Sequence, residues 1–133
     1  MTRRSLRENV FTVLFRNDFF SPEEMDEQIK LYLGSEDKKN LSDNEKLEIE
    51  VRIKSAILKF PEIDARIEER AEGWTITRMG KVELTIIRLA VFEMLYDADV
   101  PNPVAINEAI ELAKKYGGDE APSFVNGILA KLA

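Results

Sequence analysis

With 133 residues, 44% of them hydrophobic and 33% charged, the chain has the size and composition of one domain with a buried core. It contains no cysteine and no histidine, which excludes disulfides, thiolate metal sites, cysteine nucleophiles, Ser-His-Asp triads and histidine acid–base catalysis, and so weighs strongly against an enzyme. The formal net charge of −6 argues against a generic binder of polyanions, and no apolar run approaches the roughly 20 residues of a membrane span.

Residues 2–18 are predicted to form an amphipathic helix that begins with a cluster of arginines. Arg3, Arg4 and Arg7 place three positive charges within the first seven residues of an otherwise acidic chain. Like charges at this spacing repel one another, and the positive end of the helix dipole disfavours cations. The cluster either binds phosphates, for which the planar guanidinium is suited, or is a solvated charge cluster without a partner. The spacing alone favours the second interpretation.

Two capping boxes predict where the next helices begin. Ser21 with Glu24, and Ser42 with Glu45, have the spacing at which a serine hydroxyl and a glutamate satisfy the free N–H groups of a first helical turn. The first of these helices should end at Gly34.

Residues 43 to about 60 are predicted to form the second of them, with a broad apolar stripe facing the core. The stripe is expected to consist of Leu47, Ile49, Val51, Ile53, Ala56, Ile57, Leu58 and Phe60. Pro61 should end or kink this helix, because proline lacks a backbone N–H and clashes with the preceding turn. A short amphipathic helix should follow to about residue 71, and its charges of alternating sign predict a solvated face, not a metal site.

The only tryptophan, Trp74, stands at a helix junction and is expected to pack in the core. Residues 78–96 then form the most apolar helix of the chain. A helix that is apolar nearly all round is predicted to lie at the centre of a bundle. Arg88 interrupts it, and because a charge in such a setting needs a partner, Arg88 is expected to pair across the bundle or to cap a helix.

The last third of the chain, from Val100 onward, predicts two more helices. Gly117 and Gly118 should stop the first one, since glycine adopts the left-handed conformation without a Cβ penalty. Gly127 lies inside the second, where glycine is unfavourable by about 1 kcal/mol relative to alanine, so another backbone is expected to approach it closely. Asn107 and Asn126 are expected in semi-buried positions, as hydrogen-bonding ties between helices.

The pattern as a whole predicts an all-α bundle of about seven helices and no strand. It contains no glycine-rich phosphate loop, EF-hand spacing, internal repeat or low-complexity tract. From the residues alone, the chain is a small helical protein with a basic N-terminal tip on an acidic body.

The order of these features resembles the bacterial NusB family of transcription antitermination factors. The most specific parts are VAINEAIELAKKYG (104–117) and FVNGIL (124–129), with Asp99-Val100-Pro101 before them. The segment IIRLAVFEML (86–95) looks like the central helix of that family, and RRSLRENVFTVLF (3–15) looks like its arginine-rich first helix. The resemblance runs nearly end to end.

The resemblance implies a single RNA-binding domain over residues 1–133, with seven helices in two packed three-helix sub-bundles of about 1–72 and 73–133. It implies binding of boxA RNA, a single-stranded element of nascent ribosomal RNA leaders, in a heterodimer with the small-subunit ribosomal protein NusE. The complex would load onto RNA polymerase in the cytoplasm and suppress termination. The family implies no cofactor, no catalytic residue and no metal.

Site residues carry over from the family at matching positions. The RNA-binding residues are implied to be Arg3, Arg4 and Arg7. The NusE-facing residues are implied to be Phe15, Glu83, Glu120 and Phe124. The family usually has a small residue where Leu6 stands, and it often has aspartate at Glu120, so this chain departs mildly at both surfaces.

Two other functions stay open at this point. The chain is also similar to the RNA-targeting domain of ribosomal RNA cytosine methyltransferases, although it has neither a Rossmann-type sheet nor a cysteine nucleophile. The third interpretation is a helical module that binds protein alone. In an RNA-binding factor that acts with a basic protein, each partner should increase the affinity for the other, whereas a module that binds protein alone would show no such coupling. The family resemblance leaves both a monomer and a homodimer open.

Overall fold

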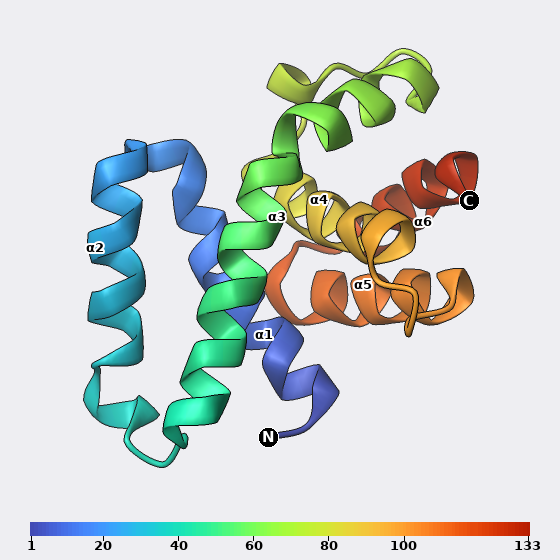
Figure 1. The fold of residues 1–133 in the computed structure, drawn as a ribbon. Coiled ribbons are helices and arrows are strands. Elements are labelled where there is room, and N and C mark those ends of the chain that lie inside the picture. Colours follow the sequence, from blue (N-terminus) through green and yellow to red (C-terminus); the bar gives the residue numbers. More distant parts are fainter. The chain divides into compact units, whose positions relative to one another are not determined.

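The computed structural model describes all residues 1–133, which form helices joined by short connections and no β-strand (Figure 1). With η for a 3-10 helix, the elements are α1 (Arg3–Leu14), η1 (Phe15–Phe19), α2 (Pro22–Leu33), η2 (Glu36–Lys38), α3 (Asp43–Arg70), η3 (Ile76–Arg78), α4 (Lys81–Tyr96), α5 (Asn102–Tyr116) and α6 (Ala121–Leu132). The predicted all-α fold is confirmed.

The chain forms two compact units, Met1–Leu58 and Lys59–Ala133. The boundary lies within α3, whereas the family resemblance implied a break near Gly73. The first unit therefore holds α1, α2 and the first part of α3, and the second holds the rest of α3 with α4, α5 and α6. That the whole chain acts as one RNA-binding domain stays a prediction.

The helix α3 runs through Pro61 without a break. The sequence counted two helices here, which is why it expected about seven in all. Proline removes only its own N–H from the ladder of backbone hydrogen bonds, so the flanking turns can hold the helix together. Phe60, Ile63 and Ile67 are buried on one face across this point, and that burial favours a continuous helix.

Both predicted capping boxes are present in the first unit. The Ser21 hydroxyl accepts a hydrogen bond from the Glu24 backbone N–H at 3.2 Å, and the Ser21 N–H donates to the Glu24 carboxylate at 2.9 Å. Ser42 and Glu45 repeat this arrangement at 3.1 and 2.9 Å. These local bonds fix the starts of α2 and α3, as sequence spacing alone indicated.

Three apolar side chains of α3 are exposed, against prediction. Leu47, Val51 and Leu58 are 57%, 55% and 79% exposed, whereas Ile49 and Ile53 are fully buried. A helix facing a core buries one stripe of its surface, and at about 100° per residue these three side chains point away from that stripe. The sequence assigned every apolar residue of this helix to the core and was wrong at these positions.

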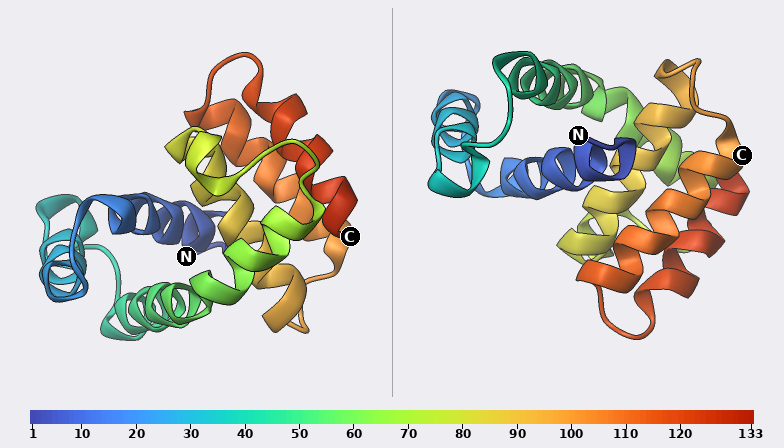
Figure 2. Two further views of the ribbon diagram at one scale, coloured as in Figure 1. Left: turned by 90° about the horizontal axis from the view of Figure 1, so that it is seen from above. Right: turned by 90° about the horizontal axis from the view of Figure 1, so that it is seen from below.

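In the second unit, α4, α5 and α6 each pack against the other two (Figure 2). Leu84, Ile86 and Ile87 of α4 are fully buried, so the expectation of a buried central helix is confirmed. The helix begins at Lys81 with Gly80 as N-cap, three residues later than predicted, because Ile76–Arg78 form the separate helix η3.

Arg88 has the charged partner that was expected for it, and that partner is Asp64 on α3. The guanidinium donates from Nε to one carboxylate oxygen and from Nη2 to the other, each at 2.8 Å, and lies 4.7 Å from the centre of the Phe60 ring. Two parallel charge-assisted bonds of this kind fix both distance and orientation. The Arg88 side chain is buried, while that of Asp64 is 26% exposed.

The C-terminal glycines and asparagines differ from expectation. Gly117 has φ −97°, and the only positive φ in the chain, +80°, is at Gly73. A Cβ at Gly117 would collide with the Ala121 Cβ and lie 2.9 Å from the Ala113 carbonyl oxygen. The end of α5 therefore requires glycine because there is no space for a side chain, not because of a left-handed backbone. Gly127, Asn107 and Asn126 are exposed, and nothing lies within 4 Å of a Cβ at Gly127. The predicted close approach and interhelical ties are therefore wrong.

Replacing Arg88 with alanine should lower the free energy of unfolding by about 3 kcal/mol, because it removes a buried bidentate pair and leaves unfilled space beside Phe60. Urea unfolding followed by circular dichroism measures this. Arg66→Ala, an exposed site on the same part of α3, should change stability by less than about 0.5 kcal/mol. Equal effects of the two substitutions would show that the pair does not stabilise the unit.

Candidate nucleic-acid and protein interfaces

The arginines of α1 lie at a helix end that lacks acidic residues. Arg3 and Arg4 are exposed, whereas Arg7 is only 7% exposed. The free N–H groups and the dipole of a helix N-terminus attract anions, and two exposed guanidiniums add to that attraction. Arg3 and Arg4 are thus accessible to solvent, whereas Arg7 offers little of its surface.

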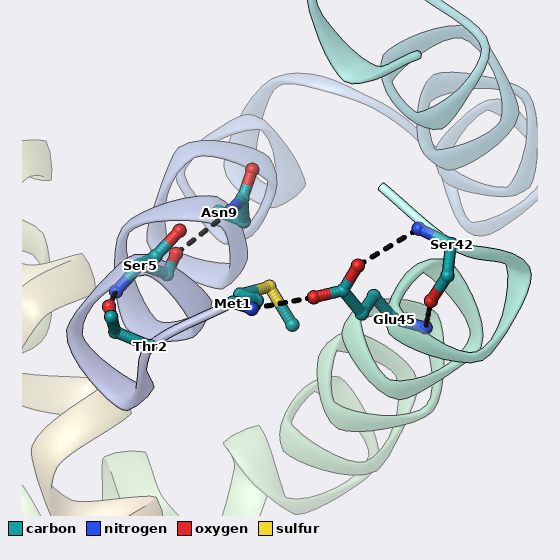
Figure 3. A network of polar contacts seen from close by, with 6 residues as sticks. All are labelled: Met1, Thr2, Ser5, Asn9, Ser42 and Glu45. Carbon is teal, nitrogen blue, oxygen red and sulfur yellow. Dashed lines mark hydrogen bonds and ion pairs between the residues drawn. The ribbon is translucent and has the colours of Figure 1, made fainter. Parts of the chain in front are cut away.

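A chain of polar contacts holds this helix end in place (Figure 3). The Thr2 hydroxyl caps α1 by accepting from the Ser5 N–H at 2.9 Å, and Asn9 donates to the Ser5 carbonyl at 2.8 Å. The Tyr32 hydroxyl of α2 donates to the Asn9 amide oxygen at 2.6 Å. These contacts link the first turns of the arginine-bearing helix to α2 inside the first unit.

Glu45 ties the first residue of the chain to the start of α3. Its carboxylate lies 2.7 Å from the Met1 ammonium while also accepting from the Ser42 N–H, as Figure 3 shows. The hydrogen bond from the ammonium, followed by the one from the Ser42 backbone, holds the pKa of Glu45 below its ordinary value of 4.5. The ionised form is therefore the one that the fold stabilises.

A second candidate surface is a pocket of about 580 Å³ in the second unit. It is built from η3, the first turns of α4 and the start of α6. Its lining residues are Trp74, Arg78, Met79, Gly80, Glu83, Glu120, Ala121, Ser123 and Phe124. Three of the four residues implied to face a protein partner thus come together in one cavity.

The aromatic wall of this pocket is formed by Trp74 and Phe124. Their rings meet edge to face at 5.0 Å with an interplanar angle of 76°, and the Arg78 guanidinium lies 5.7 Å from the Trp74 ring. Trp74 is 41% exposed, so the expectation that it packs in the core is wrong. The signal that could have revealed it is its place directly after Gly73, whose positive φ turns the chain at the pocket rim.

Gly80 leaves room for the Glu83 carboxylate, because a Cβ on Gly80 would collide with one of its oxygens. A Cβ on Gly117 would only make an ordinary contact of 3.7 Å with the other oxygen. The side chain stands in the first turn of α4, where the helix dipole stabilises a negative charge. Glu83 and Glu120 give the pocket two carboxylates beside an aromatic wall, an arrangement that suits a cationic side chain with an apolar stem.

Phe15 lies in the other unit, in η1. Its ring meets those of Phe11 and Phe19 at tilted angles of 40° and 53°, with ring centres 6.4 and 5.4 Å away. Phe19 is 57% exposed. Phe15 thus belongs to an aromatic cluster of its own. The chain has no group of acidic side chains that could hold a metal ion, and no helix long and apolar enough to cross a membrane.

A sequence model of the NusB family matches residues 4–133. The chain belongs to the NusB family. A transcription antitermination protein NusB from Lachnoclostridium phytofermentans is 49% identical over 99% of this chain and 98% of its own length. The resemblance seen in the motifs at 86–95, 104–117 and 124–129 is confirmed.

Solved NusB structures share the whole fold. T. maritima NusB matches with a TM-score of 0.84 and 32% identity, covering 100% of this chain and 91% of that one. A crystal structure of antitermination factors NusB and NusE in complex with dsRNA matches with a TM-score of 0.79 and 27% identity, covering 98% and 94%. The helical framework that presents α1 and the pocket is thus a NusB framework.

Glu45→Gln should lower the melting temperature near pH 7, because the neutral amide cannot form an ion pair with the Met1 ammonium. A group with a lowered folded-state pKa contributes stability above its unfolded pKa and loses it as pH falls through the folded value. The difference between wild type and Glu45→Gln should therefore shrink toward about pH 3, as thermal melts at a series of pH values would show. Glu24→Gln, which alters a capping box without the ammonium, is the control. A difference that grew on acidification would contradict the pairing.

Proposed function

We propose that this chain is a transcription antitermination factor that binds boxA-type single-stranded RNA of nascent ribosomal RNA leaders together with the ribosomal protein NusE. The observation that carries the proposal is that one chain of the NusB family combines an arginine-bearing helix end with an acidic, aromatic pocket. Relatives that match 98–100% of their own length bear the name transcription antitermination protein.

The RNA-binding part of the proposal assigns the phosphate contacts to the first turns of α1. Arg3 and Arg4 are exposed there. Guanidiniums bind phosphate in a fork geometry and also stack on bases, which are accessible only in unpaired RNA. Arg7 is proposed as a third contact. Because its side chain is buried, a substitution at Arg7 should alter the packing of α1 as well as RNA binding.

The protein-binding part assigns the NusE contact to the pocket, with Glu83, Glu120 and Phe124 as contact residues and Phe15 as a further contact from η1. A ribosomal protein is basic, and the net charge of −6 on this chain steers such a partner toward it. The carboxylate of Glu83 can pair with the charged end of a lysine or arginine side chain of the partner, while the Trp74 and Phe124 rings cover the apolar stem of that side chain.

The antitermination role further proposes that the complex joins RNA polymerase, acts in the cytoplasm and has no catalytic step of its own. The absence of histidine and cysteine from the sequence supports the last point. The alternative of a methyltransferase RNA-targeting domain has no counterpart among the names of the relatives compared above.

Arg3→Ala and Arg4→Ala should each weaken binding of boxA-type RNA. Each should also reduce the magnitude of the slope of log K against log salt by about 0.7, the value for one phosphate contact to a single strand. Arg7→Ala should lower the slope by a similar amount and also reduce thermal stability, because its side chain is buried. Fluorescence anisotropy with labelled RNA at several salt concentrations measures this.

Arg70→Ala, which removes the same charge from an exposed position in the second unit, is the matched control and should leave the slope unchanged. A duplex of the same sequence separates single-strand from double-strand recognition. Unchanged affinity and slope in Arg3→Ala and Arg4→Ala would remove the RNA assignment from α1.

Glu83→Gln should weaken NusE binding about tenfold at low salt, because it removes one charge from the pocket while keeping its shape. Glu111→Gln, on an exposed part of α5, should leave the affinity unchanged. Trp74 is the only tryptophan of the chain and lines the pocket, so its fluorescence reports on occupancy. Titration calorimetry should also show tighter RNA binding when NusE is present. NusE binding without such coupling would favour a module that binds protein alone.

A further inference from the structure

Two cations and one tyrosine form a cluster in the first unit that neither candidate interface includes. Arg16 of η1, Tyr32 of α2 and Lys38 of η2 make up this Tyr32 cluster. The Arg16 guanidinium lies 5.5 Å from the centre of the Tyr32 ring, and the Lys38 ammonium lies 4.8 Å from the same centre. All three side chains are partly exposed, so one aromatic ring holds two positive charges where a ligand can reach them.

The two cations of the Tyr32 cluster are not neutralised by carboxylates of this chain. Arg16 donates from Nη1 to the amide oxygen of Gln28 at 3.0 Å, and this acceptor is neutral. Lys38 has only a small effect on its neighbour Asp37. The pKa of that exposed carboxyl is lowered first by a hydrogen bond from Ser35 and least by the charge of Lys38. Both positive charges therefore remain available to an external anion.

The distance between these charges favours an anionic ligand. Because both lie within 5.5 Å of one ring centre, they are at most about 10 Å apart, which is about one Debye length at 0.1 M salt. The ring attracts each cation through its quadrupole, but it leaves the net charge of the pair unchanged. Two unpaired cations beside an aromatic ring are the composition of surfaces that follow a single nucleic-acid strand.

The Tyr32 ring is tied to the arginine-bearing end of α1. Its hydroxyl donates to the Asn9 amide oxygen at 2.6 Å, and Asn9, only 7% exposed, donates to the Ser5 carbonyl at 2.8 Å. Figure 3 shows the contact between Asn9 and Ser5 in the first turns of α1. These are the turns that carry Arg3 and Arg4. The cluster and the candidate RNA contact are thus joined through buried polar groups of one unit.

We propose that the Tyr32 cluster is a second phosphate-binding site, which takes the continuation of a single RNA strand bound at Arg3 and Arg4. Arg16 and Lys38 each neutralise one phosphate, and the Tyr32 ring holds the two cations in position for the strand. This inference rests on the proposed function, which places the first RNA contact at the start of α1.

The separation of the two sites sets the length of RNA that reaches both. Arg4 and Arg16 are twelve positions apart on α1 and the directly following η1, which is about 18 Å at 1.5 Å per residue. A stacked strand advances about 3.4 Å per nucleotide, so about five nucleotides separate the two contacts. An RNA of about five nucleotides therefore fills only the first site, whereas one of about twelve nucleotides reaches the second as well.

Arg16→Gln and Lys38→Gln should each weaken the binding of a single-stranded RNA of about twelve nucleotides by about fivefold at 0.1 M salt. Each should also reduce the magnitude of the slope of log K against log salt by about 0.7, the value for one phosphate contact. An RNA of about five nucleotides should bind both variants within about twofold of wild type. Lys30→Gln is the matched control, because Lys30 is exposed on α2 and two residues from Tyr32, on another side of that helix.

Two substitutions of Tyr32 separate its ring from its hydroxyl. Tyr32→Phe and Tyr32→Leu both remove the hydrogen bond to Asn9, so thermal melts should show a loss of stability in both. Only Tyr32→Leu removes the ring that holds Arg16 and Lys38, so only this variant should weaken the binding of the longer RNA by about fivefold or more. Equal RNA affinities of the two variants would show that Tyr32 acts on stability alone.

Fluorescence anisotropy with both RNA lengths decides the proposal. Wild-type affinity of Arg16→Gln and Lys38→Gln for the longer RNA would overturn it and leave an acidic protein segment as the anion that suits the cluster. Equal losses with both RNA lengths would also overturn it, since the two cations would then belong to the first contact. Arg3→Ala and Arg4→Ala are measured in parallel on the short RNA. Weakened binding there shows that the contact at α1 holds even where the second site fails, and unchanged binding there removes the first contact itself.

Discussion

The second unit depends on the pairing of Arg88 with Asp64. The helix α4 is buried nearly all round, and a guanidinium in its middle would be strongly unfavourable without a charged partner. Two bonds of 2.8 Å to Asp64 supply that partner and fix α4 against the C-terminal part of α3. The first turn of α4 carries Glu83, which lines the pocket. The location of the candidate protein interface therefore follows from how this pair and the surrounding apolar side chains hold α4.

Both candidate interfaces use helix N-termini, in opposite ways. In the pocket, Glu83 lies in the first turn of α4 and Glu120 is the N-cap of α6, so the helix dipoles stabilise both negative charges. At α1 the sequence does the reverse, with arginines and no acidic residue in the first turn. A helix N-terminus with exposed cations is suited to an anion, which the helix dipole and the free N–H groups also attract. A cationic partner and an anionic partner are thus suited to different helix ends of one chain.

Prediction from sequence succeeded where the cause is local and failed where it depends on the packing of distant residues. The capping boxes at Ser21 and Ser42 were found because both partners lie within one turn. Trp74 and Leu58 were assigned to the core because they are apolar, but which apolar residues face solvent depends on where neighbouring helices pack. Gly127 shows the same limit, because whether another backbone approaches a glycine inside a helix is set by the packing of other elements. The family resemblance grouped Glu83, Glu120 and Phe124, but it did not reveal that Trp74, more than 40 residues from Phe124 in the sequence, forms the wall of the same pocket.

The sequence by itself determined the helical class, the helix starts, the lack of cysteine and histidine chemistry, and the motifs that mark the NusB family. All of these follow from residue identity and from spacings within a few turns. Only the tertiary structure decided that α3 continues through Pro61, that Arg88 meets Asp64, that Arg7 is buried while Arg3 and Arg4 are exposed, and that the outer face of α3 is left uncovered. The physical reason is that a side chain is buried only where another element packs against it. A sequence pattern shows which face of a helix is apolar, but not which element, if any, packs against that face.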